Sequence, residues 1–391
     1  MNAPLSKKLN EVKWGEFKIG DLFEIKKISN MLSKEDLSDD YIYPAYSSDS
    51  ENNGIIGYTN SPEFICDEKH PVYITFGDHT RTLNIARKSF SVLDNVKVLL
   101  PCTNKNNSLL FMISVWKKQI PNLGYARHWK VAKNCILSLP VTLENKIDFD
   151  FMEAFIRELE EERIRELAAY LKVSGFDNYT LSKCESEALA HFNELKWKEF
   201  NLIDIFDVKN THNILSNEIN KDSGNVPYLC ASSVNNGVSS YISYKEELVE
   251  KGNCIFIGGK TFVVSYQEKD FFSNDSHNLA LYVKGLQPTK LNQLYLATCV
   301  YKGLNHKYTW GDSISGAKIK SDKIMLPIAS DDSPDYAFME TFISAVQKLV
   351  IKDVVLYADK KIAATKQAVR KNPSDYKAAE GFGALKAAEH D

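Results

Sequence analysis

The sequence predicts an α+β fold built from two β-rich units in tandem, each followed by a long helix. Residues 13–58 align without a gap with residues 196–241, and both stretches open with a Lys-Trp-x-Glu-Phe sequence. The similarity resumes at two Leu-Pro sequences, which precede matching Phe-Met-Glu-x-Phe-Ile sequences at residues 151–156 and 338–343. A repeat of this length indicates two copies of one folded unit.

Between these matching stretches the two copies differ. Residues 74–133 and 255–323 occupy corresponding places but agree poorly. The sequence therefore predicts two similar scaffolds that carry different parts.

Composition limits the class of protein. A chain of 391 residues with 44% hydrophobic residues can form two or three domains with hydrophobic cores. Seven cysteines without a Cys-x-x-Cys pair favour a reducing compartment over a disulfide-stabilised protein. No apolar run reaches the length of a membrane span, and residues 1–10 lack the apolar centre of a signal peptide. We therefore expect a cytoplasmic protein without membrane contact.

Short β-branched runs between turn residues predict strands in both units. These runs lie at residues 72–76 and 95–100 in the first copy and at 253–257 and 263–266 in the second. The Asn-Gly pairs at 53–54 and 236–237 predict tight turns, because glycine readily adopts positive φ.

A long helix follows each β-rich unit. The first is predicted from about Phe151 to Val173, with Asp150 and Glu153 as a capping pair. The second follows a cap at Ser333-Pro334-Asp335 and continues to about Lys371. Apolar residues spaced by three and four predict a seam on each helix for packing against another helix. The seam residues are Phe151, Phe155, Leu159 and Leu167 in the first helix and Met339, Phe342, Val346, Val350 and Tyr357 in the second.

These elements divide the chain into five segments. They are a β-rich unit at 1–147, the first long helix with its linker at 148–195, a second β-rich unit at 196–332, the second long helix at 333–371 and a tail at 372–391. A short helix is expected in the linker from about Cys184 to Phe192, and the Ala- and Lys-rich tail is expected to fray.

The order, spacing and duplication of these motifs resemble the DNA specificity subunit of type I restriction-modification systems and the related recognition subunit of type IIB enzymes. The resemblance rests on the Trp-x-x-Phe and Asp-[Leu/Ile]-Phe-[Glu/Asp] openings at 13–26 and 196–209 and on the Leu-Pro-[Val/Ile] sequences at 139–141 and 326–328. It covers roughly residues 13–371.

The resemblance implies a function and a set of partners. Each β-rich unit would be a target recognition domain that reads half of a bipartite DNA site. The two long helices would pack antiparallel as a coiled-coil-like spacer and dock two methyltransferase subunits. The Gln that many type I members place soon after Leu-Pro is missing here. The choice between a type I methyltransferase and a fused endonuclease–methyltransferase as partner therefore stays open.

No motif for catalysis or cofactor binding was found in the chain. No two prolines are adjacent, so the [Asn/Asp]-Pro-Pro-[Tyr/Phe] motif with which a methyltransferase grips a flipped base is absent. The triplets Glu24-Ile25-Lys26 and Asp207-Val208-Lys209 have no Pro-Asp upstream, which favours exposed strands over a nuclease site. We expect no cofactor and no metal in this chain. The resemblance places S-adenosylmethionine and Mg²⁺ on partner subunits, with an endonuclease subunit as a further partner.

Basic residues interleaved with aromatic ones mark candidate DNA-binding segments at 124–130 and 306–310. Lys and Arg neutralise phosphates and release counterions, and Arg can bind guanine through two hydrogen bonds. Polar loops at 77–81 and 258–261 follow predicted strands, where recognition residues usually lie. The candidates are His79, Thr80, Arg81, Arg87, Lys117, Lys118, Tyr125, Arg127, His128, Lys130 and Lys133 in the first copy, and Lys260, Thr261, His306, Lys307, Tyr308, Lys318 and Lys320 in the second. The alternative for these segments is an ordinary solvated surface.

We therefore predict a non-catalytic specificity subunit that recognises an asymmetric, bipartite double-stranded DNA site. The alternative is a β-rich protein-interaction scaffold with a coiled-coil arm and no nucleic-acid role, which the formal net charge of −3 favours. The first long helix is rich in Glu, so its exposed face should point away from DNA and serve partner docking.

Overall fold

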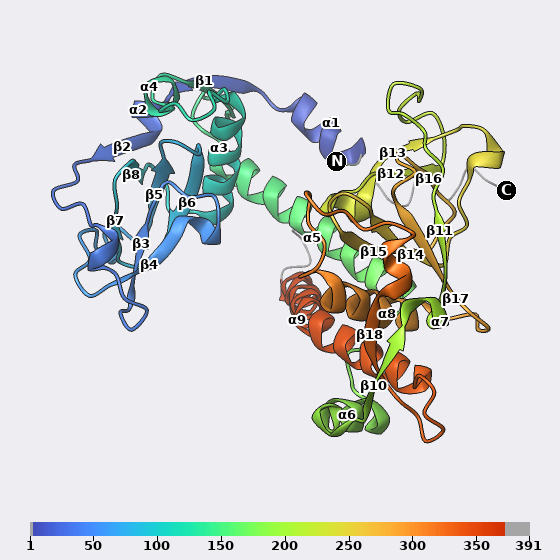
Figure 1. Ribbon diagram of the computed structural model, residues 1–391. Coiled ribbons are helices and arrows are strands. Elements are labelled where there is room, and N and C mark those ends of the chain that lie inside the picture. Colours follow the sequence, from blue (N-terminus) through green and yellow to red (C-terminus); the bar gives the residue numbers. More distant parts are fainter. Residues whose placement is uncertain (1–2, 372–391) are drawn as a thin grey trace. The chain divides into compact units, whose positions relative to one another are not determined.

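The computed structural model describes residues 3–371, which divide into two compact units (Figure 1). Unit 1 contains the described residues up to Leu167 together with those from Lys360 onward, and unit 2 contains Ala168–Asp359. The predicted tail at 372–391 lies outside the described residues. Within residues 3–371, no helix combines the length and the apolar character needed to cross a membrane.

Unit 1 is a β-rich body with four helices of its own and the first part of a long fifth one. Its strands are β1 (Trp14–Lys18), β2 (Phe23–Lys26), β3 (Tyr43–Tyr46), β4 (Ile55–Thr59), β5 (Tyr73–Gly77), β6 (Thr82–Ala86), β7 (Ser91–Val92), β8 (Val96–Pro101) and β9 (Ile136–Pro140). Its helices are α1 (Ala3–Glu11), α2 (Ile19–Leu22), α3 (Asn106–Gln119), α4 (Trp129–Ala132) and the start of α5 (Phe149–Val173), with 3₁₀ turns η1 (Lys34–Asp36) and η2 (Asn52–Gly54).

Unit 2 repeats this order of strands. They are β10 (Trp197–Asn201), β11 (Phe206–Asn210), β12 (Val226–Leu229), β13 (Val238–Ile242), β14 (Cys254–Gly258), β15 (Val263–Gln267), β16 (Phe272–Ser273), β17 (Leu279–Val283) and β18 (Lys323–Pro327). The helices are α6 (Lys183–Ala190), α7 (Leu202–Ile205), α8 (Lys290–Leu304) and the start of α9 (Tyr336–Lys371), with 3₁₀ turns η3 (Phe192–Glu194), η4 (Val234–Gly237), η5 (Glu246–Leu248) and η6 (Lys318–Ser321).

The two units share one sheet topology. A four-stranded antiparallel sheet has the order β2-β8-β5-β6 in unit 1 and β11-β17-β14-β15 in unit 2. A three-stranded sheet has the order β4-β3-β7 in unit 1 and β13-β12-β16 in unit 2. The repeat seen in the sequence is therefore a repeat of the fold.

A two-stranded ribbon explains why the Lys-Trp and Leu-Pro motifs recur together. β1 pairs with β9 so that Trp14 lies opposite Pro140, and β10 pairs with β18 so that Trp197 lies opposite Pro327. These motifs are far apart in the sequence but form the entry and exit strands of each scaffold.

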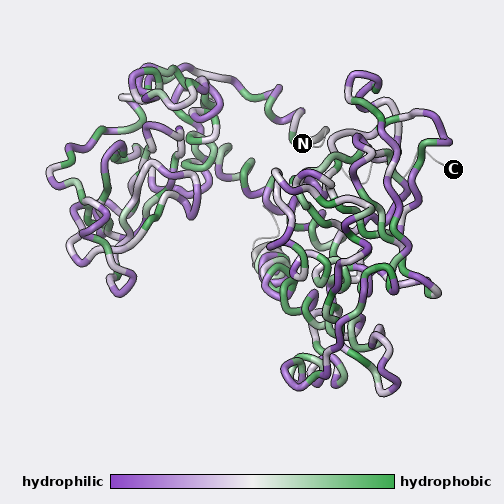
Figure 2. The backbone as a smooth tube through the Cα atoms, in the orientation of Figure 1, coloured by the Kyte–Doolittle hydropathy of each residue, from purple (hydrophilic) through white to green (hydrophobic). Residues whose placement is uncertain are grey.

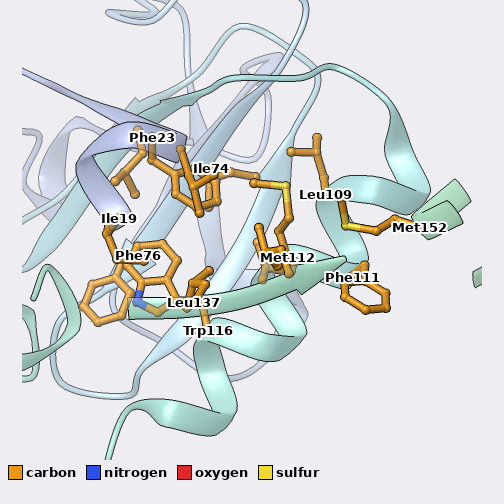
Figure 3. Close-up of a cluster of buried hydrophobic side chains, with 14 of the residues drawn as sticks. Ile19, Phe23, Ile74, Phe76, Leu109, Phe111, Met112, Trp116, Leu137 and Met152 are labelled. Carbon is orange, nitrogen blue, oxygen red and sulfur yellow. The ribbon is translucent and has the colours of Figure 1, made fainter. Parts of the chain in front are cut away.

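The core of unit 1 lies between the four-stranded sheet and helix α3 (Figure 3). Phe23 and Phe76 stack on Trp116, with ring centroids 5.1 and 5.9 Å apart. The loops at the periphery of each unit are mainly hydrophilic (Figure 2). Unit 2 has an equivalent core, in which Phe206 and Leu296 are buried.

The cap of the first long helix differs from the prediction. Helix α5 begins two residues earlier than expected, and the backbone N–H of Phe151 donates to Oδ1 of Asp148 at 2.8 Å. Asp150 instead pairs with Lys105. Glu153 accepts a hydrogen bond from the Ser108 backbone at 2.6 Å, so it ties α5 to α3 and does not cap its own helix.

The second long helix has the same kind of cap. The backbone N–H of Phe338 donates to Oδ1 of Asp335 at 2.9 Å, and Ser333 instead donates to Asp331. A carboxylate at the start of a helix satisfies unpaired N–H groups and interacts favourably with the helix dipole.

The predicted seam residues at the start of each long helix have a different partner than expected. Met339 and Phe155 are buried in the cores of their own globular units, and Phe151, Leu159 and Phe342 pack against those cores. Apolar spacing predicted the buried face correctly, but the side chains that cover it there belong to the core of each globular unit, among them Phe111 of α3 and Tyr295 of α8.

Further along α9 the predicted seam is also corrected. Val350 is 75% exposed and Tyr357 is 48% exposed, whereas Val355 and Ala358 are buried. Val346 is half-buried, as is Leu167 on α5. In this later part of α9 the buried residues therefore lie on another face of the helix than the one the sequence pattern indicated.

A buried ionic cluster holds the linker helix α6 onto α9 within unit 2. Glu185 is 6% exposed, accepts from Ser344 at 2.6 Å and pairs with Lys348 at 2.8 Å. Glu185 also accepts from the backbone of Ser182, which completes a capping box at the start of α6. Burial alone would raise the pKa of Glu185, but the hydrogen bonds from Lys348, Ser344 and Ser182 lower it to about 2.

We predict that Lys348→Met destabilises the protein by about 3–5 kcal/mol at neutral pH, because it leaves a buried carboxylate without its cation. The folded pKa of Glu185 lies below the unfolded one, so the stabilisation is present above about pH 4.5 and is lost as the pH falls through about 2. The difference between wild type and variant should therefore shrink on acidification, as measured by urea unfolding.

The matched control is Lys198→Met, which removes an exposed pair with Asp332 and should cost only about 0–1 kcal/mol. An equal effect of the two variants at neutral pH would contradict the role given to Glu185.

Candidate DNA interface

The same hairpin turn occupies the tip of the four-stranded sheet in both units. Between β5 and β6, the N–H of Arg81 donates to the carbonyl of Gly77 at 2.9 Å, and between β14 and β15 the N–H of Phe262 donates to Gly258 at 2.8 Å. Arg81 and Phe262 have φ values of 58° and 51°. Non-glycine residues seldom adopt such values, so the shared conformation indicates a turn that the scaffold imposes.

Different side chains occupy this shared turn. Arg81 points its guanidinium Nη1 at the carbonyl of Ile120, 2.8 Å away, which ties the hairpin to the loop that follows α3. Phe262 packs instead on the rings of Tyr308 and Tyr301, with centroids 5.5 and 6.4 Å away. The hairpin is thus tied to the loop after α3 in unit 1, by a hydrogen bond, and to the loop after α8 in unit 2, by the ring contact with Tyr308.

The side chain of His128 holds the loop between α3 and α4, residues 120–128, in place through hydrogen bonds. Its Nε2 accepts from the N–H of Leu123 at 3.0 Å, so Nδ1 carries the hydrogen and donates to the carbonyl of Asp78 at 2.9 Å. The side chain of Asp78 accepts from the N–H of Trp129 at 2.6 Å. His128 has no exposed surface, so the prediction that it contacts DNA is corrected to a structural role.

Other residues of the loop that contains His128 are exposed. Tyr125 is 95% exposed, although it is a large aromatic side chain, and Arg127 is also exposed. The ring of His79 lies 5.9 Å from that of Tyr125, and its Nδ1 lies 3.1 Å from the Tyr125 carbonyl oxygen. The neighbouring Thr80 hydrogen bonds to Thr82 at 2.8 Å within the hairpin.

Helices α3 and α4 bring further basic residues to this loop. Nε1 of Trp116 donates to the carbonyl of Ala132 at 3.0 Å, which joins the end of α3 to the end of α4. The exposed cations on these two ends and on the loop between them are Lys117, Lys118, Arg127, Lys130 and Lys133. We call these five residues the unit 1 basic cluster.

One candidate of unit 1 lies apart. Arg87 follows β6, at the end of that strand opposite to the hairpin. Its Nη2 donates to Oδ1 of Asn106 at 3.1 Å. The structure therefore does not bring Arg87 together with the unit 1 basic cluster.

A hollow of about 750 Å³ lies beside the unit 1 hairpin. Its wall includes Ser47, Asp49 and Asp94, and the adjacent Ser48 accepts from the N–H of His79 at 2.9 Å. The wall contains three aspartates and one lysine, Lys34, so the hollow is unsuited to phosphate. No residue of the unit 1 basic cluster lines it.

In unit 2 three of the four candidate lysines, Lys260, Lys307 and Lys318, are paired with acids. Lys260 lies 2.9 Å from a carboxylate oxygen of Asp275, and Lys318 pairs with Asp312. Burial alone would raise the pKa of Asp275, but the hydrogen bonds from the His277 backbone and from Lys260 lower it to about 2.

Tyr308 is another candidate that proves to be structural. It is 3% exposed, and its hydroxyl donates to Asp322, which also pairs with Lys307. Burial and the hydrogen bond to Asp322 raise the pKa of Tyr308. Tyr308 and Lys307 therefore hold the loop after α8, and the prediction of a direct DNA contact by Tyr308 is corrected.

Other residues of this loop are available to a ligand. Trp310 is 75% exposed beside Gly311, and His306 and Lys320 are exposed. Thr261 is exposed on the hairpin, where its hydroxyl donates to the carbonyl of Ala231 at 3.0 Å. Trp310 belongs to the predicted basic-aromatic segment but was not among the candidates. Its place next to glycine, a sign of a turn, is the signal that could have found it.

Across residues 3–371 there is no group of three or more His, Cys, Asp or Glu side chains arranged to hold a metal ion. The seven cysteines are all free thiols. Burial raises the pKa of Cys254 and of Cys299 to about 12, so these two thiols are not nucleophilic at neutral pH.

Comparison with known proteins identifies the family. Residues 11–169 and 194–356 match the family described as "Type I restriction modification DNA specificity domain", once for each unit. The chain belongs to this family. It is a specificity subunit of a restriction-modification system, whose function is recognition of a DNA sequence, and specificity subunits are not themselves catalytic.

Two similar proteins support the assignment. The Type II restriction enzyme specificity subunit S.BcgI of Heyndrickxia coagulans is 22% identical over 358 residues, which cover 88% of this chain and 97% of that subunit. The crystal structure of the type I restriction-modification S subunit from M. genitalium has the same fold, with a TM-score of 0.57, 14% identity and coverage of 93% of this chain and 95% of that one. A protein-interaction scaffold without a nucleic-acid role is not favoured.

We predict that Arg127→Ala and His128→Ala fail in different ways. Arg127 is exposed, so its loss should change stability by no more than about 0.5 kcal/mol and weaken DNA binding by about 1–3 kcal/mol. His128→Ala removes a fully buried side chain together with its hydrogen bonds to the Leu123 N–H and the Asp78 carbonyl, of which only the carbonyl keeps another donor, the backbone N–H of residue 128. The substitution should therefore cost about 1–3 kcal/mol and lower the unfolding temperature.

Thermal unfolding and fluorescence anisotropy with duplex DNA would measure both effects. Wild-type DNA affinity in Arg127→Ala, or wild-type stability in His128→Ala, would contradict these roles.

Proposed function

We propose that this specificity subunit recognises a bipartite DNA site with two unlike halves, one bound by each unit. The observation that carries the proposal is that the same hairpin turn holds different side chains in the two units. The same turn presents His79, Thr80 and Arg81 in unit 1 and Lys260, Thr261 and Phe262 in unit 2. Sequence is read by side chains at base edges, so equal scaffolds with unequal loops favour two different half-sites.

The exposed aromatic side chains fit the same proposal. Tyr125 lies in the loop that follows α3 and Trp310 in the loop that follows α8, each near basic residues. Lysine and arginine contacts to phosphate orient a protein on the duplex, and side chains on the same loop then reach the bases.

We also propose that the long helices dock methyltransferase subunits. The apolar side chains Leu349, Val350 and Val354 of α9 are 49%, 75% and 38% exposed. Exposed apolar residues grouped on one helix are a common sign of a protein interface. A methyltransferase bound there would carry S-adenosylmethionine and perform adenine methylation, and an endonuclease partner would use Mg²⁺.

The same helices would form the spacer between the half-sites. Helix α5 begins in unit 1 and ends in unit 2, whereas α9 begins in unit 2 and ends in unit 1. Within unit 1, Lys361 of α9 donates to Glu160 of α5. This order supports antiparallel packing, in which the length of both helices sets the gap between the half-sites.

Equal insertions in both helices test the spacer and the bipartite site together. Four helix-forming residues after Leu167 and four after Asp359, where both helices pass between units, would add about 6 Å to each. Because one base pair rises about 3.4 Å, the gap should grow by one or two base pairs while both half-sites stay the same.

The wild-type and variant chains would be co-expressed with a methyltransferase subunit that binds them, and methylated adenines mapped at base resolution. A matched variant with four residues inserted only in the exposed turn at 144–145 should keep the original gap. Active complexes with an unchanged gap would refute the spacer, and methylation at an uninterrupted site would refute the bipartite proposal.

A further inference from the structure

The two units differ in how their basic residues are neutralised. The five cations of the unit 1 basic cluster, defined above, make no ion pair with any acid within residues 3–371. Residues 115–133 also contain no Asp or Glu. In unit 2, three of the four candidate lysines are paired, Lys260 with Asp275, Lys307 with Asp322 and Lys318 with Asp312, whereas the fourth, Lys320, is exposed and makes no ion pair within residues 3–371.

The acids of unit 2 are held in place by more than these lysines. Asp275 also accepts from the backbone N–H of His277 at 2.9 Å, and it is largely buried. Asp322 is 2% exposed and accepts from the hydroxyl of Tyr308. If Lys307 turned to a phosphate, a buried carboxylate would lose its cation, which is strongly unfavourable.

This difference bears on the ionic part of DNA binding. A lysine that neutralises a phosphate releases condensed counterions, and each such contact adds about 0.9 to the slope of log affinity against log salt concentration. A lysine already paired with a carboxylate brings no net charge to the phosphate, and its acid repels the DNA. Paired lysines therefore contribute little to this slope.

We propose that the two units contribute unequally to DNA binding, and that unit 1 makes most of the ionic, sequence-independent contacts with the DNA backbone. Unit 2 then binds its half-site mainly through non-ionic contacts, to which the exposed Trp310 and Thr261 can contribute. This inference rests on the proposed DNA contact of both units and assigns unequal chemistry to them. It also means that unit 1 forms the first, salt-dependent complex with any DNA sequence.

Matched double substitutions test the asymmetry in the full-length chain. Lys117→Gln with Lys130→Gln removes two unpaired cations, and Lys260→Gln with Lys318→Gln removes two paired ones. A third variant, Asp312→Asn, releases Lys318 from its acid. The probe is a short duplex of mixed sequence, whose binding is measured by fluorescence anisotropy over a range of KCl concentrations. Thermal unfolding checks that each variant is folded.

The unit 1 double variant should lower the slope of log affinity against log salt concentration by about 1.8, since two phosphate contacts are lost at about 0.9 each. The unit 2 double variant should change this slope by less than about half of the value for one phosphate contact. Asp312→Asn should raise the slope by up to about 0.9. Equal decreases of the slope in the two double variants would overturn the proposed asymmetry, as would a larger decrease in the unit 2 double variant. A wild-type chain with no salt-dependent binding would instead overturn the proposed DNA contact itself.

Discussion

Burial of the first turns of each long helix in the core of its own unit is the constraint on which the rest of the structure depends. Met152 of α5 and Met339 of α9 have no exposed surface, and they belong to the clusters that also contain the main sheet residues of their units. Truncating a fully buried methionine to alanine costs about 2–5 kcal/mol, so these anchors are strong. The carboxylates of Asp148 and Asp335 cap the same turns. Each helix therefore leaves its unit in a direction set by the scaffold, and the recognition loops keep a defined orientation to that helix.

Much of this scaffold could be predicted from the sequence, because the residues that pair across it recur. Trp14 and Trp197 are repeated together with the prolines opposite them, so the duplicated motifs marked the places of the ribbon strands, although their pairing was not predicted. The turn at Asn53-Gly54 is also as expected, since both residues have positive φ. The covered face of each long helix start was indicated by apolar spacing, but spacing does not reveal which element covers that face. Several acids stand near the start of α5, and only tertiary structure shows that Asp148 is the cap.

The candidate site was less predictable, because the sequence does not distinguish a buried polar group from an exposed one. His128 and Tyr308 look like DNA ligands among basic neighbours, yet both are buried and hold loops through hydrogen bonds. The pairing of Lys260 with Asp275 brings together residues that the sequence separates. The structure shows that one hairpin can be secured by Arg81 in one unit and by Phe262 in the other. Recognition loops can therefore change their chemistry while the scaffold beneath them stays the same.

The central claim is that each unit alone determines one half of the recognised sequence. Its most direct test is a chain in which residues 19–135 are replaced by residues 202–322, so that both units carry the loops of unit 2 and the ribbon strands of unit 1 are kept. The chimaeric chain would be expressed with its methyltransferase partner, and methylated sites would be mapped at base resolution. The account predicts a site with two identical half-sites, both equal to the wild-type half that unit 2 reads. Retention of the unit 1 half-site by a folded, active chimaera would contradict it.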